Sequence, residues 1–224
     1  MAVETIQTGI TGFDESIGGL PKGHTLLLAG PVGSYTELFG LEFLYRGALK
    51  QEKTLYVAFE KKEEDLVEMA SVFDWDLEAP LKSKDLIVLS SELFNYDKFL
   101  SGLEDTIFSQ KATRVVFDSI TFLGGFFDTP FKFRAALGEM RRMFNRQDCT
   151  TMLISESKGD ELSPFGVEEF VADGIIHLHA IKKGGQVIHA VSVPEMTGME
   201  VKPQMYPLEI TKKGMKVRKL PLVL

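Results

Sequence analysis

The segment from Gly30 to Glu37 has the form of a loop that surrounds the phosphates of a nucleotide. It follows the apolar run 26–29 and precedes a helix-forming stretch. Such loops have the pattern G-x-x-x-x-G-K-[ST], in which the glycines let backbone N–H groups surround the phosphates, the lysine contacts them and the hydroxyl holds Mg²⁺. When the pattern is laid on Gly30 without a gap, its second glycine is Tyr35, its lysine is Thr36 and its hydroxyl residue is Glu37. The scaffold of the loop is kept, and its ligand-binding side chains are replaced.

These replacements disfavour tight binding of Mg-ATP. Loss of the lysine removes a charge-assisted hydrogen bond worth about 1.5–3 kcal/mol. A carboxylate about 4 Å from a phosphate charge adds repulsion of about 4 kcal/mol at an effective dielectric constant near 20. We therefore predict a vestigial nucleotide pocket with no catalytic residue and no cofactor, formed by Gly30, Gly33, Ser34, Tyr35, Thr36, Glu37, Glu60 and Asp118. The other interpretation of the loop is a plain turn between a strand and a helix.

Glu60 and Asp118 belong to this set because each follows a predicted strand. The apolar runs 55–59 and 115–117, the second preceded by Arg114, end at these carboxylates. Ligands of open α/β sheets bind at the carboxyl ends of the strands. An aspartate after a hydrophobic strand is typical of the second nucleotide motif, in which it orients Mg²⁺. The alternatives are that Asp118 caps the next turn and that Glu60 is a pocket residue without a catalytic role.

Composition restricts the classes of function. A chain of 224 residues without a linker of low complexity favours one domain, 1–224. The net charge of −7 makes nucleic acid an unlikely general partner. A single cysteine, Cys149, and the lack of a signal-peptide core or a long apolar run predict a cytoplasmic protein that does not enter membranes. His177, His179 and His189 lack the spacing of a metal site, so we expect no metal.

Four segments resemble the KaiC-like and RadA-like branch of the RecA superfamily of P-loop ATPases. They are the lead-in 8–23, which reads TGITGFDESIGGLPKG, and the stretches 41–47, 168–176 and 206–217. Together they extend over nearly the whole chain. The resemblance implies an α/β fold of the RecA-like P-loop type, with a mainly parallel central sheet, helices on both faces and antiparallel C-terminal strands.

The resemblance also implies roles for individual positions. Glu60 matches the glutamate that polarises the attacking water, and Lys61 stands where these ATPases have a second glutamate. The stretch 195–199 has lost the basic residues that reach the γ-phosphate of a neighbouring subunit. With its degenerate phosphate loop, the chain resembles a pseudo-ATPase with an interaction or regulatory role. The alternative is an active or weakly active ATPase, in which Glu60 and Asp118 hold Mg²⁺ and Lys61 or a neighbouring chain supplies the missing cation.

Partner binding is predicted from an aromatic cluster in the stretch 122–134. Its members are Phe122, Phe126, Phe127, Phe131 and Phe133. A connector punctuated by glycine and proline cannot easily bury so many rings, so we expect an exposed apolar patch. The alternative is that the rings pack under the following helix, expected over 131–146. The expected partners are a second copy of the chain, a related active ATPase, or a peptide segment such as the apolar tail 220–224. A further helix, expected over 99–108, has Phe108 on its apolar face.

Overall fold

The computed structural model describes residues 3–91, 95–158 and 161–222. Its main sheet has nine strands in the order β11-β10-β9-β8-β3-β7-β6-β4-β5. The strands from β8 to β5 are parallel to their neighbours, whereas β8 to β11 pair antiparallel. The bounds are β3 Thr25–Gly30, β4 Thr54–Ala58, β5 Leu86–Ser90, β6 Arg114–Asp118, β7 Thr150–Glu156, β8 Gly174–Lys183, β9 Gln186–Met196, β10 Met205–Thr211 and β11 Gly214–Val217. A separate small sheet pairs β1 Thr5–Ile6 with β2 Leu20–Pro21.

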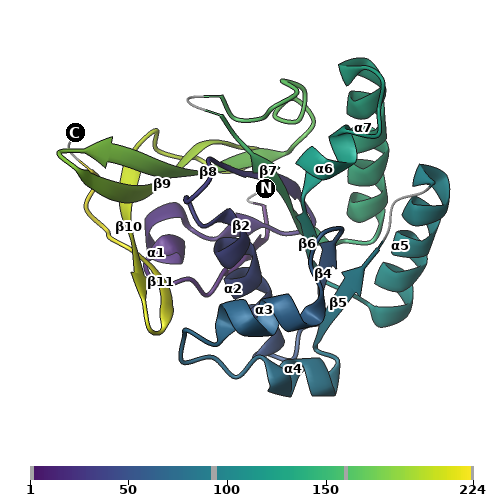
Figure 1. The fold of residues 1–224 in the computed structure, drawn as a ribbon, viewed down its shortest axis with the longest axis horizontal. Helices are drawn as coiled ribbons and strands as arrows, with labels where there is room; N and C mark the ends of the chain where they lie inside the picture. The colour runs from purple at the N-terminus through teal and green to yellow at the C-terminus, as the bar shows by residue number, and fades with distance from the viewer. Residues whose placement is uncertain (1–2, 92–94, 159–160, 223–224) are drawn as a thin grey trace.

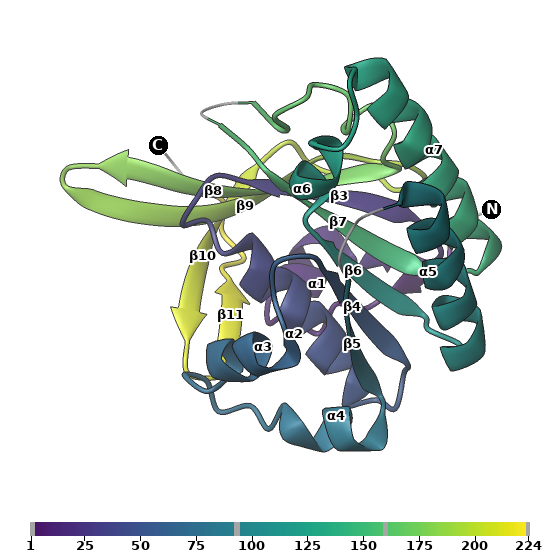
Figure 2. The same cartoon turned by 45° about the vertical axis from the view of Figure 1, so that its right-hand side comes forward.

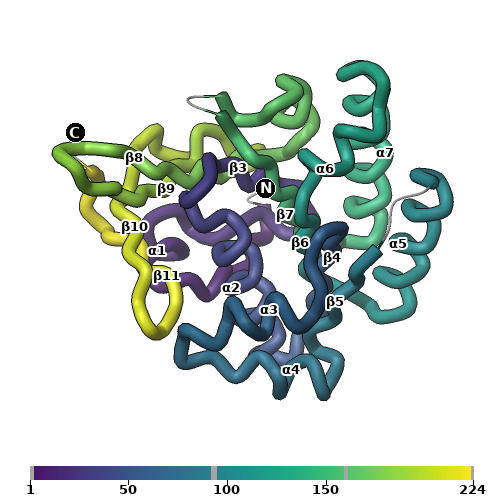
Figure 3. Tube along the Cα trace, in the orientation of Figure 1, coloured from purple at the N-terminus to yellow at the C-terminus, as the bar shows by residue number. Residues whose placement is uncertain are grey.

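Helices cover both faces of the sheet (Figure 1). One face carries α1 Phe13–Ile17, α2 Thr36–Ala48, α3 Glu63–Ala70 and α4 Glu78–Ser83. The other carries α5 Tyr96–Gln110, α6 Ile120–Gly124 and α7 Pro130–Arg146. Figure 2 shows α5 and α7 side by side on this second face, and in Figure 3 the trace of α2 passes through the middle of the molecule. This is the α/β architecture that the sequence predicts.

The apolar run of β3 explains why both faces are covered. Successive side chains of a strand point to opposite faces of the sheet. Leu26 and Leu28 pack in the cluster under α1 to α4, whereas Leu27 and Ala29 pack in the cluster under α5 to α7. A strand buried on both sides needs apolar residues at every position, which is what this run provides.

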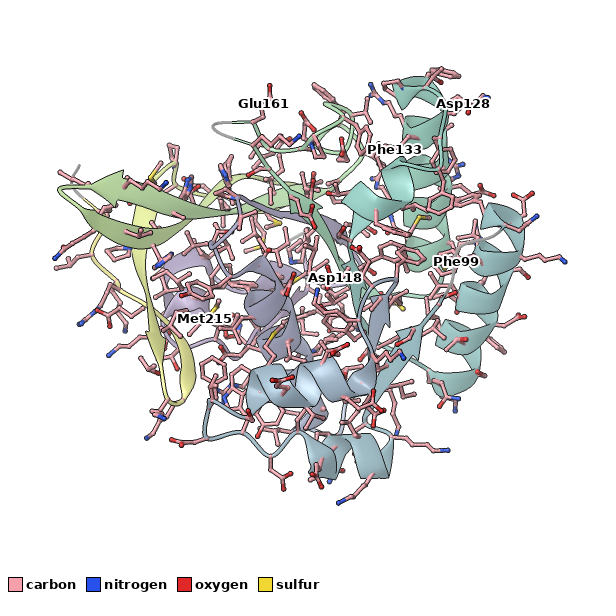
Figure 4. The ribbon with its side chains drawn as sticks, in the orientation of Figure 1. Phe99, Asp118, Asp128, Phe133, Glu161 and Met215 are labelled. Carbon is pink, nitrogen blue, oxygen red and sulfur yellow. The ribbon has the colours of Figure 1, made fainter. Side chains whose placement is uncertain are left out.

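Register brings the carboxyl ends of four adjacent strands to one edge. Gly30, the last residue of β3, pairs with Glu156 at the end of β7. Asp118, the last residue of β6, pairs with Ala58 at the end of β4. Because β3, β7, β6 and β4 are consecutive in the sheet, the loops that follow them lie next to one another. Figure 4 shows Asp118 near the centre of the molecule.

Two expectations about aromatic positions need correction. Phe108 does not contribute to the apolar face of α5, because its side chain is 72% exposed while the adjacent Ile107 faces the sheet. The stretch after β6 is not only a connector, because it contains α6, whose first turn is capped by Ser119.

Among the described residues, no helix combines the length and apolar character that a membrane span requires. The last two residues of the predicted docking tail lie outside the described residues.

Candidate functional site

The loop between β3 and α2 turns through two residues with a left-handed backbone conformation. Gly33 has a φ of 84° and Tyr35 a φ of 70°, so Tyr35 adopts the left-handed conformation at the position where the pattern has its second glycine. A left-handed residue other than glycine costs about 1–2 kcal/mol. A Cβ at Gly30 would lie 2.2 Å from the Ser34 hydroxyl oxygen and 2.9 Å from the Thr36 methyl group, so a larger residue there would displace the loop side chains. The Tyr35 ring packs edge-on against His189, with 4.9 Å between ring centroids.

Lys61 joins the two carboxylates that the loop and β6 present. Its Nζ lies 3.0 Å from Glu37 Oε1 and 3.0 Å from Asp118 Oδ2. The same Asp118 oxygen accepts a hydrogen bond of 2.6 Å from the hydroxyl of Tyr56, a buried residue of β4. An ammonium group therefore lies between the helix that follows the loop and the end of β6. In a nucleotide-binding loop of this type, the metal and the phosphate oxygens lie between these two elements.

Electrostatics favours the charged form of Lys61. Burial alone lowers the pKa of this ammonium group, but attraction to Asp118 and the hydrogen bond to Glu37 outweigh burial and raise the pKa above its ordinary value. The pKa of Tyr56 is raised well above its ordinary value, first by burial and then by the charge of Asp118. The tyrosine hydroxyl therefore stays protonated and donates to Asp118. We call Glu37, Lys61, Asp118 and Tyr56 the lysine bridge.

Glu60 and Glu156 add negative charge around the bridge. The Glu60 side chain is exposed, and Glu60 has no ion pair within 4.0 Å among the described residues. Glu156 ends β7, and its pKa is raised by burial and then by Asp118, Glu60 and Glu37. The structure thus brings Glu37 and Asp118 together through a lysine and leaves Glu60 outside the bridge.

A pocket of about 450 Å³ opens beside the bridge. It lies between the loop, the start of α2 and the end of α3. Most of its walls are apolar, from Pro31, Val32, Leu38, Met69, Val72 and Phe73, and its polar lining includes Glu37 and Glu156. The sequence analysis missed the wall formed by Met69, Val72 and Phe73. The apolar residues of 66–73 were the available signal, but nothing in their spacing shows that they face the loop.

The histidines do not gather around an ion site. The rings of His177 and His179 have centroids 4.0 Å apart, and His179 Nε2 lies 2.8 Å from the hydroxyl of Ser192. Burial lowers the pKa of His179, which favours its neutral form. His189 packs against Tyr35 instead. Within residues 3–91, 95–158 and 161–222, no group of three or more histidine, cysteine or acidic side chains is placed to hold a metal ion.

The predicted aromatic patch divides into core and surface. Phe133 is 1% exposed, because the period of α7 points it toward the sheet, and its ring packs against Phe165 at 5.1 Å. It therefore belongs to the core and not to an exposed patch. Phe122 and Phe127 are half-buried against other rings. Phe126, 51% exposed, and Phe131, 80% exposed, remain as surface.

The fold and the position of the loop place this chain among the α/β proteins of the RecA-like P-loop class. A KaiC-like protein from the archaeon Pyrococcus horikoshii OT3 superposes with a TM-score of 0.88 over 96% of this chain and 99% of its own, at 32% sequence identity. The family described as "ATPase: KaiC" matches residues 6–221. The chain belongs to the KaiC family.

Curated relatives agree with this membership. The circadian clock oscillator protein KaiC of Parathermosynechococcus lividus is 32% identical over 226 residues, which cover 94% of this chain and 42% of that protein. Its counterpart in Thermostichus vulcanus is 30% identical over 223 residues, 93% of this chain and 43% of that protein. The chain thus spans about two fifths of the length of these relatives.

Proposed function

We propose that this chain is a KaiC-family domain that does not hydrolyse ATP and acts as an interaction or regulatory protein. The observation that carries the proposal is the lysine bridge. Lys61 satisfies Glu37 and Asp118 at 3.0 Å each, so the region between the loop helix and the end of β6 already holds a cation attached to the chain. Binding of Mg²⁺ there would require the ammonium group to leave two carboxylates.

The loop side chains support the same conclusion. Thr36 offers no charge to a triphosphate, and Glu37 presents a carboxylate at the first turn of α2. A helix N-terminus favours negative charge, and Glu37 supplies from within the chain the charge that a phosphate would otherwise bring. The degenerate loop and the lysine bridge are therefore two parts of one arrangement that needs no nucleotide.

Partners of the domain follow from what remains exposed. We expect self-association or pairing with a related active ATPase, and the exposed rings of Phe126 and Phe131 are apolar side chains that a protein or peptide could cover. Light scattering should give a mass above that of one chain, unchanged by nucleotide. A mass equal to one chain at all concentrations tested would remove self-association from the proposal.

Isothermal titration with Mg-ATP tests the central claim. We expect no heat of binding at ligand concentrations up to about 1 mM. The matched variant carries Thr36→Lys, Glu37→Thr and Lys61→Glu, which restore the charged and hydroxyl side chains of the family pattern and leave Tyr35 in place, and it should bind Mg-ATP more tightly than the native chain. Micromolar binding by the native chain would overturn the proposal in favour of the ATP-binding alternative, in which Lys61 or a neighbouring chain supplies the cation. Equal lack of binding by the folded variant would show that these three positions alone do not account for the loss of binding.

A further inference from the structure

The pocket beside the lysine bridge has the size and chemistry of a binding site. Its volume of about 450 Å³ falls within the range of about 300–1,000 Å³ that is usual for ligand sites. Apolar groups from the loop, from α2 and from the end of α3 form its walls. An apolar pocket with a few polar groups at one end is the usual form of a site that orients one part of its ligand.

The charge of the pocket selects the sign of its ligand. Glu37 and Glu156 line it, and none of its described lining residues is basic. Asp118 and Glu60 add negative charge nearby, and together with Glu37 they raise the pKa of Glu156. Lys61 offsets only part of this charge, because its single ammonium group, which contacts Glu37 and Asp118, is one positive charge among these four carboxylates. The pocket therefore repels anions and attracts cations.

The rim of the pocket indicates what kind of molecule bears the positively charged group. Val32 is 97% exposed and Val72 is 61% exposed, so apolar surface continues from the pocket onto the outside of the molecule. Exposed apolar surface next to a pocket is typical of a site for a polypeptide, because a small ligand would leave it in water. A polypeptide is long enough to cover such a rim while one of its side chains enters the pocket.

We propose that this pocket receives an arginine side chain from a polypeptide partner. The proposal rests on the proposed function, since a bound triphosphate would occupy the same loop. Arginine fits better than lysine for two reasons. Its planar guanidinium group can bond to more than one carboxylate, and it is weakly hydrated and stacks on aromatic rings. Tyr35 and Phe73 are the aromatic lining residues that offer such a ring.

The test uses the full chain labelled with ¹⁵N and three probes, followed by ¹H–¹⁵N correlation spectra. The first probe is a pentapeptide with a central arginine between leucines, the second has citrulline in place of arginine, and the third is the free amide of N-acetylarginine. We expect the arginine peptide to shift the amide signals of Gly33, Tyr35, Thr36 and Val72, and to bind about fivefold or more tightly than the neutral citrulline peptide. The free amide should bind more weakly than the arginine peptide, because it leaves the rim uncovered.

Two variants assign the charge. Glu156→Gln removes an exposed carboxylate at the end of a strand and should weaken binding of the arginine peptide by about fivefold while leaving the citrulline peptide unaffected. Glu139→Gln, an exposed position on α7 across the sheet, is the matched control and should change neither. Equal binding of the two peptides, signals shifted away from the loop, or no shifts up to about 10 mM peptide would overturn the inference. A failure of this kind leaves the proposed function standing, because that function fails only if Mg-ATP binds to the native chain.

Discussion

Replacing Lys61 by methionine should destabilise the fold by about 2–3 kcal/mol. Methionine keeps the apolar stem of the side chain and removes the ammonium group. Asp118, which is 6% exposed, then loses a charge-assisted hydrogen bond worth about 1.5–3 kcal/mol. Glu37 is 40% exposed, so its half of the bridge adds only about 0.5 kcal/mol. The Tyr56 hydroxyl still donates to Asp118, and this contact keeps the loss below that of a fully unpaired buried charge.

Urea unfolding followed by circular dichroism at neutral pH measures this difference, provided that the slope of free energy against urea is the same in both proteins. A double-mutant cycle with Asp118→Asn isolates the contact and should give a coupling energy of about 2 kcal/mol. Lys50→Met, at an exposed position without an ion pair among the described residues, is the matched control and should change stability by less than about 0.5 kcal/mol. A loss for Lys61→Met as small as that of the control, or a coupling energy near zero, would refute the view that the lysine bridge stabilises this site.

Three further predictions concern charge and packing. Glu156→Gln should raise the melting temperature at pH 7, because the raised pKa of Glu156 means that the fold disfavours its ionised form. The gain should vanish below about pH 4.5, where the carboxyl group is protonated in both the folded and the unfolded chain. An equal gain in melting temperature at both pH values would contradict this prediction. Phe133→Ala should lower the free energy of unfolding, measured with denaturant, by about 3–5 kcal/mol. Phe131→Ala should change it by less than about 0.5 kcal/mol, because the Phe131 side chain is 80% exposed. Similar losses for the two variants would be inconsistent with the burial described. Arg114→Met should lower the free energy of unfolding by about 3 kcal/mol or more, because it leaves the Glu52 carboxylate and the Phe43 carbonyl without their hydrogen-bond donor. An unchanged free energy of unfolding in the same assay would contradict this prediction and would mean that apolar packing of methionine replaces the lost hydrogen bonds.

The sequence predicts the fold of this chain well because the signals are long and repeated. Apolar runs such as 26–29 and 115–117 are interior strands in the structure, and the predicted helix over 131–146 is α7 to within a residue. Phe108 shows the limit of such patterns. A broad apolar face drawn from spacing alone includes its edge, and only the position of α5 on the sheet shows that the edge faces water.

The candidate site is predictable in its residues and less so in its contacts. Glu37 and Asp118 stand out because they occupy or follow motif positions, and Lys61 stands out because the family resemblance leads one to expect a glutamate there. The sequence does not show that one ammonium group contacts both carboxylates, because this depends on how a side chain crosses from the end of β4 to β6 and α2. The wall formed by Met69, Val72 and Phe73 depends in the same way on how α3 lies against α2.

The lysine bridge couples Glu37, Lys61 and Asp118 through direct contacts. Asp118 is buried at the end of β6, and Glu37 in the first turn of α2 brings a second carboxylate to the same ammonium group. Without Lys61 the buried Asp118 would keep only the hydrogen bond from Tyr56, and a buried carboxylate without a cation is costly where water is excluded. Lys61 reaches both groups at 3.0 Å, so one ammonium group supplies a cation to both carboxylates. Glu37, Lys61 and Asp118 therefore act as one electrostatic unit of two carboxylates and one ammonium group, and Glu156 adds a further carboxylate at the pocket.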